Sequence, residues 1–394
     1  MDDIINSDER DAQIAALNHE IFELNKQLGS EKERYIRAVT ADRSDPFGNP
    51  TDYKDFSGDY SKILPELGTP GFSVPLVPEY AERKALQKYY SIGGWCSLFQ
   101  FFFSNGLAIL CVSAISFVMN LLNPDASSSA LADYIGGSSM LVALNMLVYM
   151  FCNILNAAIG LKLADVKASS LIRTRDLSFG SVIQYCAIGL FIWIAAIYLS
   201  SGIIDIFQQY GIDASPPNTD YGRTVMGRTI TVIYGCIIAP MTEELFYRGM
   251  LLKVFSKADQ RFAVLATALY FGIAHGNVPQ FVLGFLAGIF LAHITLKHNS
   301  IIPAVIVHMF INTFSTIYGS VNTNSSSTMM IATLILMAAA IFGLAMFIAF
   351  ICRDELPTPT PAQSKRGFSL WASTITVILS LVFYFGYFSY HLFL

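Results

Sequence analysis

The chain has 394 residues, of which 54% are hydrophobic and only 14% are charged, whereas roughly 25% of the residues in soluble domains are charged. This composition excludes an ordinary soluble globular protein and indicates a membrane protein with several spans. The net charge of −4 gives no indication of nucleic-acid binding, and the six cysteines include no CxxC pair that would suggest a thiolate zinc site.

Residues 1–92 form a polar region with 17 acidic residues against 11 Lys and Arg, a net charge of −6. The chain does not begin with an apolar stretch, so no cleavable signal peptide is predicted. Residues 14–28 place apolar side chains at alternating steps of three and four, which predicts a short heptad helix. This helix either lies on its own protein or mediates self-association or the binding of a partner. Residues 40–80 are rich in Pro, Gly, Asp and Tyr and predict a linker.

Residues 93–394 form the predicted membrane domain. A membrane-spanning helix needs about 20 largely apolar residues. Nine segments are candidates, namely 94–123, 137–163, 180–207, 226–253, 261–275, 279–297, 300–318, 328–352 and 368–393. The fifth segment is short, so the predicted fold is all-α, a polytopic transmembrane helical bundle of eight or nine spans that follows an N-terminal helical and linker region.

The distribution of Lys and Arg predicts the orientation of these spans. Nearly all the basic residues of the membrane domain fall in alternate loops, and the opposite loops carry only Arg223 and Arg228. Because basic loops stay on the cytoplasmic side, we expect the N-terminus in the cytoplasm. Long outer loops and organellar signals are absent, which favours the bacterial cytoplasmic membrane and a bacterial peptide or membrane-protein substrate.

The fourth span contains the sequence MTEELFYRGM, residues 241–250, which places two glutamates and an arginine in an apolar run. Ionisable groups inside a span are energetically unfavourable and usually mark function. Glu244 and Arg248 are four residues apart and are expected to pair on one helix face, which leaves Glu243 free to point elsewhere. Pro240 removes a backbone hydrogen bond, and a kink there would make room beside Glu243.

Two later spans carry polar residues at the same helical spacing. Phe271 and His275 are four residues apart, as are His308 and Asn312. Counting about 1.5 Å per residue from the nearest cytoplasmic charge puts Glu243, the two histidines and the asparagine at a depth of roughly 17 to 22 Å. We therefore expect these four side chains, from three spans, to lie at one level of the membrane.

Such a cluster supplies the groups that hydrolysis requires. A carboxylate in a low-dielectric interior can take a proton from water, and a neighbouring imidazole can hold that water. An amide N–H and a second imidazole can stabilise an oxyanion. We expect Glu243 to act as the base, His275 to act on the water, and His308 with Asn312 to form the oxyanion site.

Other interpretations of the same residues stay open. The glutamates and the arginine could form a structural ion-pair network, and His293 is interpreted as a packing residue. Glu243, His275 and His308 could also be zinc ligands, although no HExxH motif is present. A proton-coupled transporter is a further class, but the two halves of the chain show no convincing internal repeat.

The three elements EELFYR, FGIAH and HMFIN resemble the motifs EExxxR, FxxxH and HxxxN of the CAAX-prenyl-endopeptidase-like intramembrane proteases, also called the Abi or CPBP family. All three occur in order on separate predicted spans, within residues 226–320. The resemblance implies an all-helical, glutamate-dependent protease with its site inside the bilayer and open toward the cytoplasm. By analogy Glu243 and His275 act on the water and His308 and Asn312 bind the oxyanion.

The resemblance also assigns supporting roles to Glu244 and Arg248, and Phe271 completes its motif. The expected function is an intramembrane endopeptidase that cleaves a membrane-associated peptide or protein and needs no cofactor. The alternatives are a non-proteolytic membrane scaffold, a bacteriocin self-immunity factor, or a zinc-dependent membrane protease. The acidic N-terminal region is not part of the family pattern and leaves the substrate and the partner open.

Overall fold

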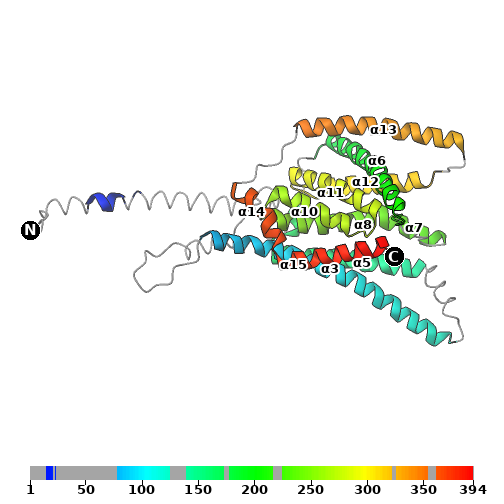
Figure 1. Cartoon of the computed structure of the whole chain (residues 1–394), viewed down its shortest axis with the longest axis horizontal. Coiled ribbons are helices and arrows are strands. Elements are labelled where there is room, and N and C mark those ends of the chain that lie inside the picture. The colour runs from blue at the N-terminus through cyan, green and yellow to red at the C-terminus, as the bar shows by residue number, and fades with distance from the viewer. Residues whose placement is uncertain are drawn as a thin grey trace, which may run out of the picture.

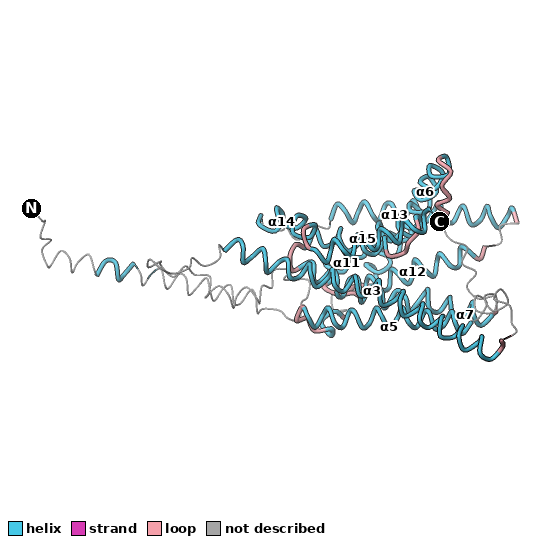
Figure 2. The backbone as a smooth tube through the Cα atoms, turned by 60° about the horizontal axis from the view of Figure 1, so that its bottom comes forward, coloured by secondary structure: helices cyan, strands magenta, loops and turns pink. Residues whose placement is uncertain are grey.

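Figure 1 shows the computed structural model of the chain, which describes residues 15–20, 23, 78–124, 139–172, 177–215, 224–321, 325–353 and 361–393. In this part of the chain every regular element is a helix, as Figure 2 shows. The predicted all-α bundle is therefore confirmed. Of the predicted heptad helix, residues 15–20 are helical and exposed. The rest of that segment, apart from residue 23, and the predicted linker lie outside the described residues.

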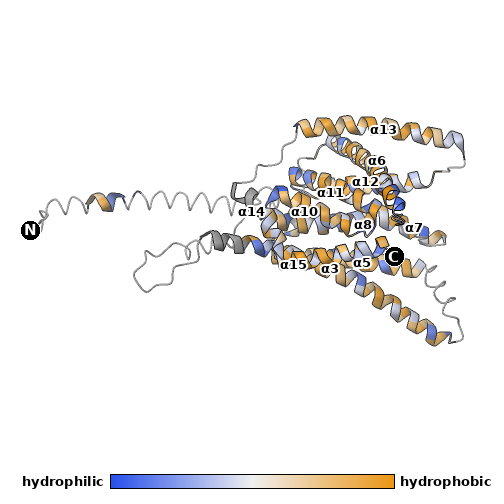
Figure 3. Cartoon of the chain, in the orientation of Figure 1, coloured by the Kyte–Doolittle hydropathy of each residue, from blue (hydrophilic) through white to orange (hydrophobic). Residues whose placement is uncertain are grey.

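Eight helical segments in the described part of the chain are long and apolar enough to cross a membrane, and Figure 3 shows that apolar residues dominate them. They are α3 (Pro78–Leu122, apolar from Leu86), α5 (Ser139–Leu163), α6 (Phe179–Gln209), the composite segment Val225–Ser256, α11 (Val278–His298), α12 (Ile302–Gly319), α13 (Ser326–Arg353) and α15 (Ile375–Phe393). The fifth predicted span is α10 (Gln260–Ile273), a helix of only 14 residues. The chain is thus a multi-pass membrane protein.

Two boundaries differ from the sequence expectation. The last predicted span, 368–393, is interrupted at residues 373 and 374, and the structure has α14 (Pro361–Ala372) before α15. Helix α3 runs without a break across residue 92, where the polar region was expected to end. A helix can continue from a polar into an apolar sequence because its backbone hydrogen bonds do not depend on the side chains.

The composite segment Val225–Ser256 is not a uniform α-helix. It consists of α7 (Val225–Ile233), the π-helix η2 (Tyr234–Ile238), α8 (Ala239–Glu244), the π-helix η3 (Leu245–Leu252) and α9 (Lys253–Ser256). Pro240 lies in the first turn of α8, directly after η2. The irregularity expected at this proline therefore takes the form of a π-helical stretch on either side of α8. Short π-helical stretches are rare and occur frequently at functional sites.

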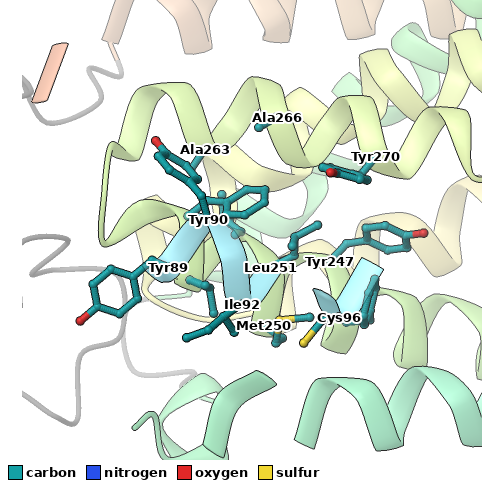
Figure 4. Packing of buried hydrophobic residues seen from close by; sticks show 14 of the residues in the cluster. Tyr89, Tyr90, Ile92, Cys96, Tyr247, Met250, Leu251, Ala263, Ala266 and Tyr270 are labelled. Carbon is teal, nitrogen blue, oxygen red and sulfur yellow. The ribbon is translucent and has the colours of Figure 1, made fainter. Parts of the chain in front are cut away.

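Two large hydrophobic clusters form the core of the described residues, and the composite segment contributes side chains to the first of them. The first joins side chains of α3, α5, η3, α9, α10, α11, α14 and α15. Figure 4 shows where residues of α3, η3 and α10 meet in it. The second joins α6, α11, α12 and α13. Residues 246–260 are buried without exception. Arg248 therefore lies in a stretch that is enclosed by protein, and the glutamates lie just before it, with Glu244 buried and Glu243 partly exposed.

Close packing of α10 against α11 positions the arginine. A Cβ added to Gly288 would lie 3.0 Å from the Cα of Ala268 and 3.5 Å from Nη2 of Arg248. Small residues allow membrane helices to approach closely, and here they bring α11 next to the guanidinium. The turn between the two helices contains Gly276 with φ of +70°, a conformation that favours glycine.

Candidate active site

Glu244 is the centre of the polar cluster. Its side chain is fully buried, and its Oε1 accepts hydrogen bonds from Nη1 of Arg248 and Nδ1 of His308, both at 2.8 Å. An ionised carboxylate can only accept, so Nδ1 of His308 carries a hydrogen. The expected pair of Glu244 and Arg248 is present in the structure. The bond from His308 was not expected, and it means that this carboxylate also fixes the orientation of the imidazole.

Arg248 is the largest fully buried side chain in the described part of the chain. Its guanidinium carbon lies 4.2 Å from the centroid of the Phe271 ring. A cation over an aromatic face is attracted to it, and the attraction is stronger when water is excluded. Phe271 therefore stabilises the cation of the pair, which gives a physical reason for an aromatic residue at this position.

Glu243 is the accessible carboxylate of the two. Its side chain is 25% exposed, whereas that of Glu244 is fully buried, and its Oε2 lies 3.8 Å from Nε2 of His308. This distance is longer than a hydrogen bond. Nδ1 of His308 carries the hydrogen that it donates to Glu244. A neutral imidazole has only one N–H, so Nε2 can act as a donor only when the ring is doubly protonated. In that form two carboxylates, one guanidinium and one imidazolium balance to zero charge, which lowers the unfavourable energy of burying them.

Phe271 also connects the two histidines. The rings of His275 and His308 both pack edge-on against it, with centroids 5.1 Å and 5.6 Å away. Nδ1 of His275 donates a hydrogen bond of 2.8 Å to the carbonyl oxygen of Phe271, because a carbonyl can only accept. Nε2 of the neutral His275 ring is consequently an acceptor. His275 lies in the turn after α10 and is half-buried.

Asn312 contacts a backbone group of the composite segment. Its Nδ2 donates a hydrogen bond of 2.8 Å to the carbonyl oxygen of Gly235 in η2. The sequence predicts an oxyanion donor at this position, whereas the bond to Gly235 was not predicted. An amide carries two N–H donors, and one of them is used here. His308 and Asn312 lie on one face of α12. His308 bonds to Glu244 at the end of α8, and Asn312 bonds to Gly235, four residues before α8 begins.

A second group of polar residues was missed by the sequence analysis. Asn153 donates from Nδ2 to Oγ1 of Thr242, at 3.3 Å, next to Glu243 in the chain. Gln100 bonds to Asn153, and Asn156 donates to Oε1 of Gln100 at 2.9 Å. These buried amides connect α3 and α5 to α8. The amides within the first two predicted spans were the available signal, but only charged residues, histidines and one asparagine were considered.

The remaining expectations concern His293 and zinc. The His293 ring packs edge-on against Phe350 of α13, with the centroids 4.9 Å apart. Among the described residues no three or more His, Cys, Asp or Glu side chains are gathered as a metal site would require. Metal dependence is a question for a chelation experiment.

Comparisons with known proteins agree with the motifs. Residues 226–314 match a family model described as type II CAAX prenyl endopeptidase Rce1-like. A relative from Bacillus subtilis (strain 168), named "Putative membrane peptidase YdiL", is 26% identical over 141 residues, which are 35% of this chain and 56% of that relative. The match thus spans about half the length of the relative. No solved structure matches the chain. Residues 226–314 are thus similar to the type II CAAX prenyl endopeptidases, and the name of the relative describes a putative membrane peptidase.

Proposed function

We propose that the chain is an intramembrane endopeptidase that hydrolyses a peptide bond in a membrane-associated peptide or protein. The observation that carries the proposal is the partly exposed carboxylate of Glu243, which lies 3.8 Å from Nε2 of His308 in an otherwise buried site. The family match and the name of the relative support a membrane protease in general terms. The reaction and the roles of the residues are our inference from the geometry.

In the first step Glu243 takes a proton from a water molecule whose other hydrogen is accepted by Nε2 of His275. The oxygen of that water attacks the carbonyl carbon of the substrate, so that a C–O bond forms and the carbonyl oxygen becomes an oxyanion. Nε2–H of the doubly protonated His308 and the second N–H of Asn312 donate to this oxyanion. Positioned donors of this kind stabilise a developing charge strongly in a site from which water is excluded.

In the second step the C–N bond breaks and the oxyanion returns to a carbonyl. Glu243 delivers its proton to the leaving nitrogen, so the products are a carboxylic acid and an amine and the base is regenerated. Glu244 and Arg248 do not need to touch the substrate. They hold the His308 ring in place, because Oε1 of Glu244 accepts from both Nη1 of Arg248 and Nδ1 of His308.

The proposal also covers the membrane in which the protein lies, its orientation there and its partners. We propose a bacterial cytoplasmic membrane with the N-terminus in the cytoplasm, because the basic residues of the membrane domain lie mostly in alternate loops. Residues 14–28 are a candidate for self-association or for binding a partner. A membrane-associated peptide or protein is the proposed substrate.

The test compares the peptides of cells that carry wild type with those of cells that carry Glu243→Gln at matched membrane levels. This substitution keeps the size of the side chain and removes the base, so we expect a loss of activity of about 10²- to 10⁴-fold. Peptides with one shared cleavage pattern should disappear. Asp205→Asn makes the same change from carboxylate to amide at an exposed position of α6, and this matched control should leave the pattern intact.

If the two sets of peptides match and both proteins rescue a deletion equally, the proposed hydrolysis is wrong. The buried network of Glu244, Arg248 and His308 would then be structural. In that case a non-proteolytic scaffold or a self-immunity factor would be the better description.

A further inference from the structure

The carbonyl group of Gly235 lacks a partner within its own helix. In a π-helix the N–H of a residue bonds to the carbonyl five residues earlier, and the N–H of Ala239 does bond to the carbonyl of Tyr234. The next bond of this series would run from residue 240 to Gly235. Residue 240 is proline, which has no N–H. The series therefore stops there and leaves the carbonyl of Gly235 to find a donor elsewhere.

The donor comes from α12. Nδ2 of Asn312 lies 2.8 Å from this carbonyl oxygen. A backbone carbonyl without a partner is strongly unfavourable at membrane depth, where no bulk water can replace the lost bond. The side chain of Asn312 thus completes the backbone hydrogen bonding of a segment 77 residues away in sequence.

The same face of α12 makes a second attachment one helical turn earlier. Nδ1 of His308 bonds to Oε1 of Glu244, the last residue of α8, and Asn312 bonds to Gly235, which precedes α8. Two contacts from residues four apart therefore hold α8 from both ends. Glu243 lies between these two attachments, so its position relative to the imidazole depends on both.

We propose that Asn312 is a positioning residue, which places Glu243 opposite His308 by bonding to the carbonyl that Pro240 leaves without a helix partner. The attachment concerns the same site as the proposed hydrolysis, but it is measurable without a substrate. If Asn312 has this role, the effect of a substitution at Asn312 depends on whether residue 240 is proline. Pro240→Ala restores an N–H to the helix, which lets Gly235 bond within its own segment and relieves Asn312 of this role.

The experiment is hydrogen exchange of the purified full chain in detergent, read by mass spectrometry over residues 234–244. Four proteins form the cycle: wild type, Asn312→Ala, Pro240→Ala and the double variant. We expect Asn312→Ala to speed exchange in this segment by about tenfold in the wild-type background, because the substitution removes the hydrogen bond to the partly buried carbonyl of Gly235. In the Pro240→Ala background the same substitution should change exchange by less than about threefold.

Asn105→Ala is the matched control. Its amide also bonds to a backbone carbonyl at 2.8 Å, but that carbonyl belongs to Phe101 of the same helix. Exchange over residues 234–244 should therefore match wild type. Asn312→Leu, which keeps the approximate size of the side chain, replaces Asn312→Ala if the alanine variant does not accumulate, and the same coupling is expected.

Equal acceleration by the Asn312 substitution in both backgrounds, or no acceleration in either, would overturn the inference. A thermal unfolding midpoint measured on the same four proteins should show the same coupling. With a substrate in hand, Pro240→Ala should recover part of the kcat lost in Asn312→Ala while KM changes little. A residue that acted only on the oxyanion would lose the same factor in kcat in both backgrounds and leave the exchange unchanged.

Discussion

Helix α13 and the composite segment Val225–Ser256 cross the same membrane with opposite designs. α13 is the most apolar of the eight spans, yet of its side chains only Gly343 and Phe350 are buried, and it packs chiefly against α6. The composite segment is among the least apolar spans, but from residue 246 onward it is buried throughout. In a bilayer, apolar side chains can face lipid and polar ones must face protein. High apolarity therefore identifies a span, whereas polarity within a span identifies the interior of the bundle.

The largest expected effect comes from breaking the buried pair in the composite segment. Glu244→Leu or Arg248→Leu leaves one buried charge without its partner and should destabilise the protein by about 3–5 kcal/mol. The double variant removes both charges and should be more stable than either single variant. Thermal unfolding in detergent and the level of protein in membranes measure both effects.

The matched control for these variants lies in α13. Arg353 is exposed at the end of that helix, so Arg353→Leu should change the unfolding midpoint little. A double variant that is as unstable as the two single losses added together would show that Glu244 and Arg248 do not compensate each other.

A smaller effect compares one type of substitution in two environments. Ile294 of α11 is fully buried, and Ile341 of α13 is 68% exposed. Ile294→Ala should lower stability by about 2–5 kcal/mol because it leaves a cavity, whereas Ile341→Ala should change it by no more than about 0.5 kcal/mol. Unfolding of both variants in the same detergent gives the comparison. Equal losses of stability would mean that protein covers α13, and the difference in burial between α13 and the interior of the bundle would then not hold.

The smallest expected effect is that of chelation. If the carboxylate of Glu243 is the base, EDTA should leave the cleavage pattern and the unfolding midpoint unchanged. Zinc added after EDTA should also have no effect, and a zinc metallopeptidase treated in parallel serves as the control. Full loss of activity with EDTA and its recovery with zinc would show that the polar cluster binds a metal.

Much of the fold follows from the sequence because a membrane helix can be recognised locally. A run of about 20 apolar residues satisfies its own backbone hydrogen bonds, so its limits depend on little outside the run. The small length of α10 was predicted because the limits of its apolar run can also be read from the local sequence. The break at Ser373 and Thr374 was missed because neither residue interrupts the apolar character of the last predicted span strongly.

The sequence predicted several of the residues that meet in the site, but it did not predict how the helices are rotated against one another. Distance along a helix axis follows from residue counting, and the residues identified in this way include Glu243 and His308, which do face each other. Which atom bonds to which depends on how each helix is rotated against its neighbours. The bond from His308 to Glu244 and the bond from Asn312 to Gly235 were unforeseen for that reason. Pro240 was an available signal for the bond from Asn312 to Gly235, because a proline has no N–H and so leaves a helix carbonyl without its usual donor.

The short α10 ties this protein to the thickness of its bilayer. A helix of 14 residues is about 21 Å long, while the hydrocarbon layer is about 30 Å thick. A helix of this length is too short to cross such a layer, so the turn at residues 274–277, which carries His275, ends it before a full crossing. Its polar groups are already partly satisfied, since Nδ2 of Asn277 donates to the carbonyl of His275 and Oδ1 accepts from the backbone of Gln280. Lipids with short acyl chains relieve the mismatch and bring the aqueous phase closer to His275, so lipid composition becomes a determinant of how water reaches this site.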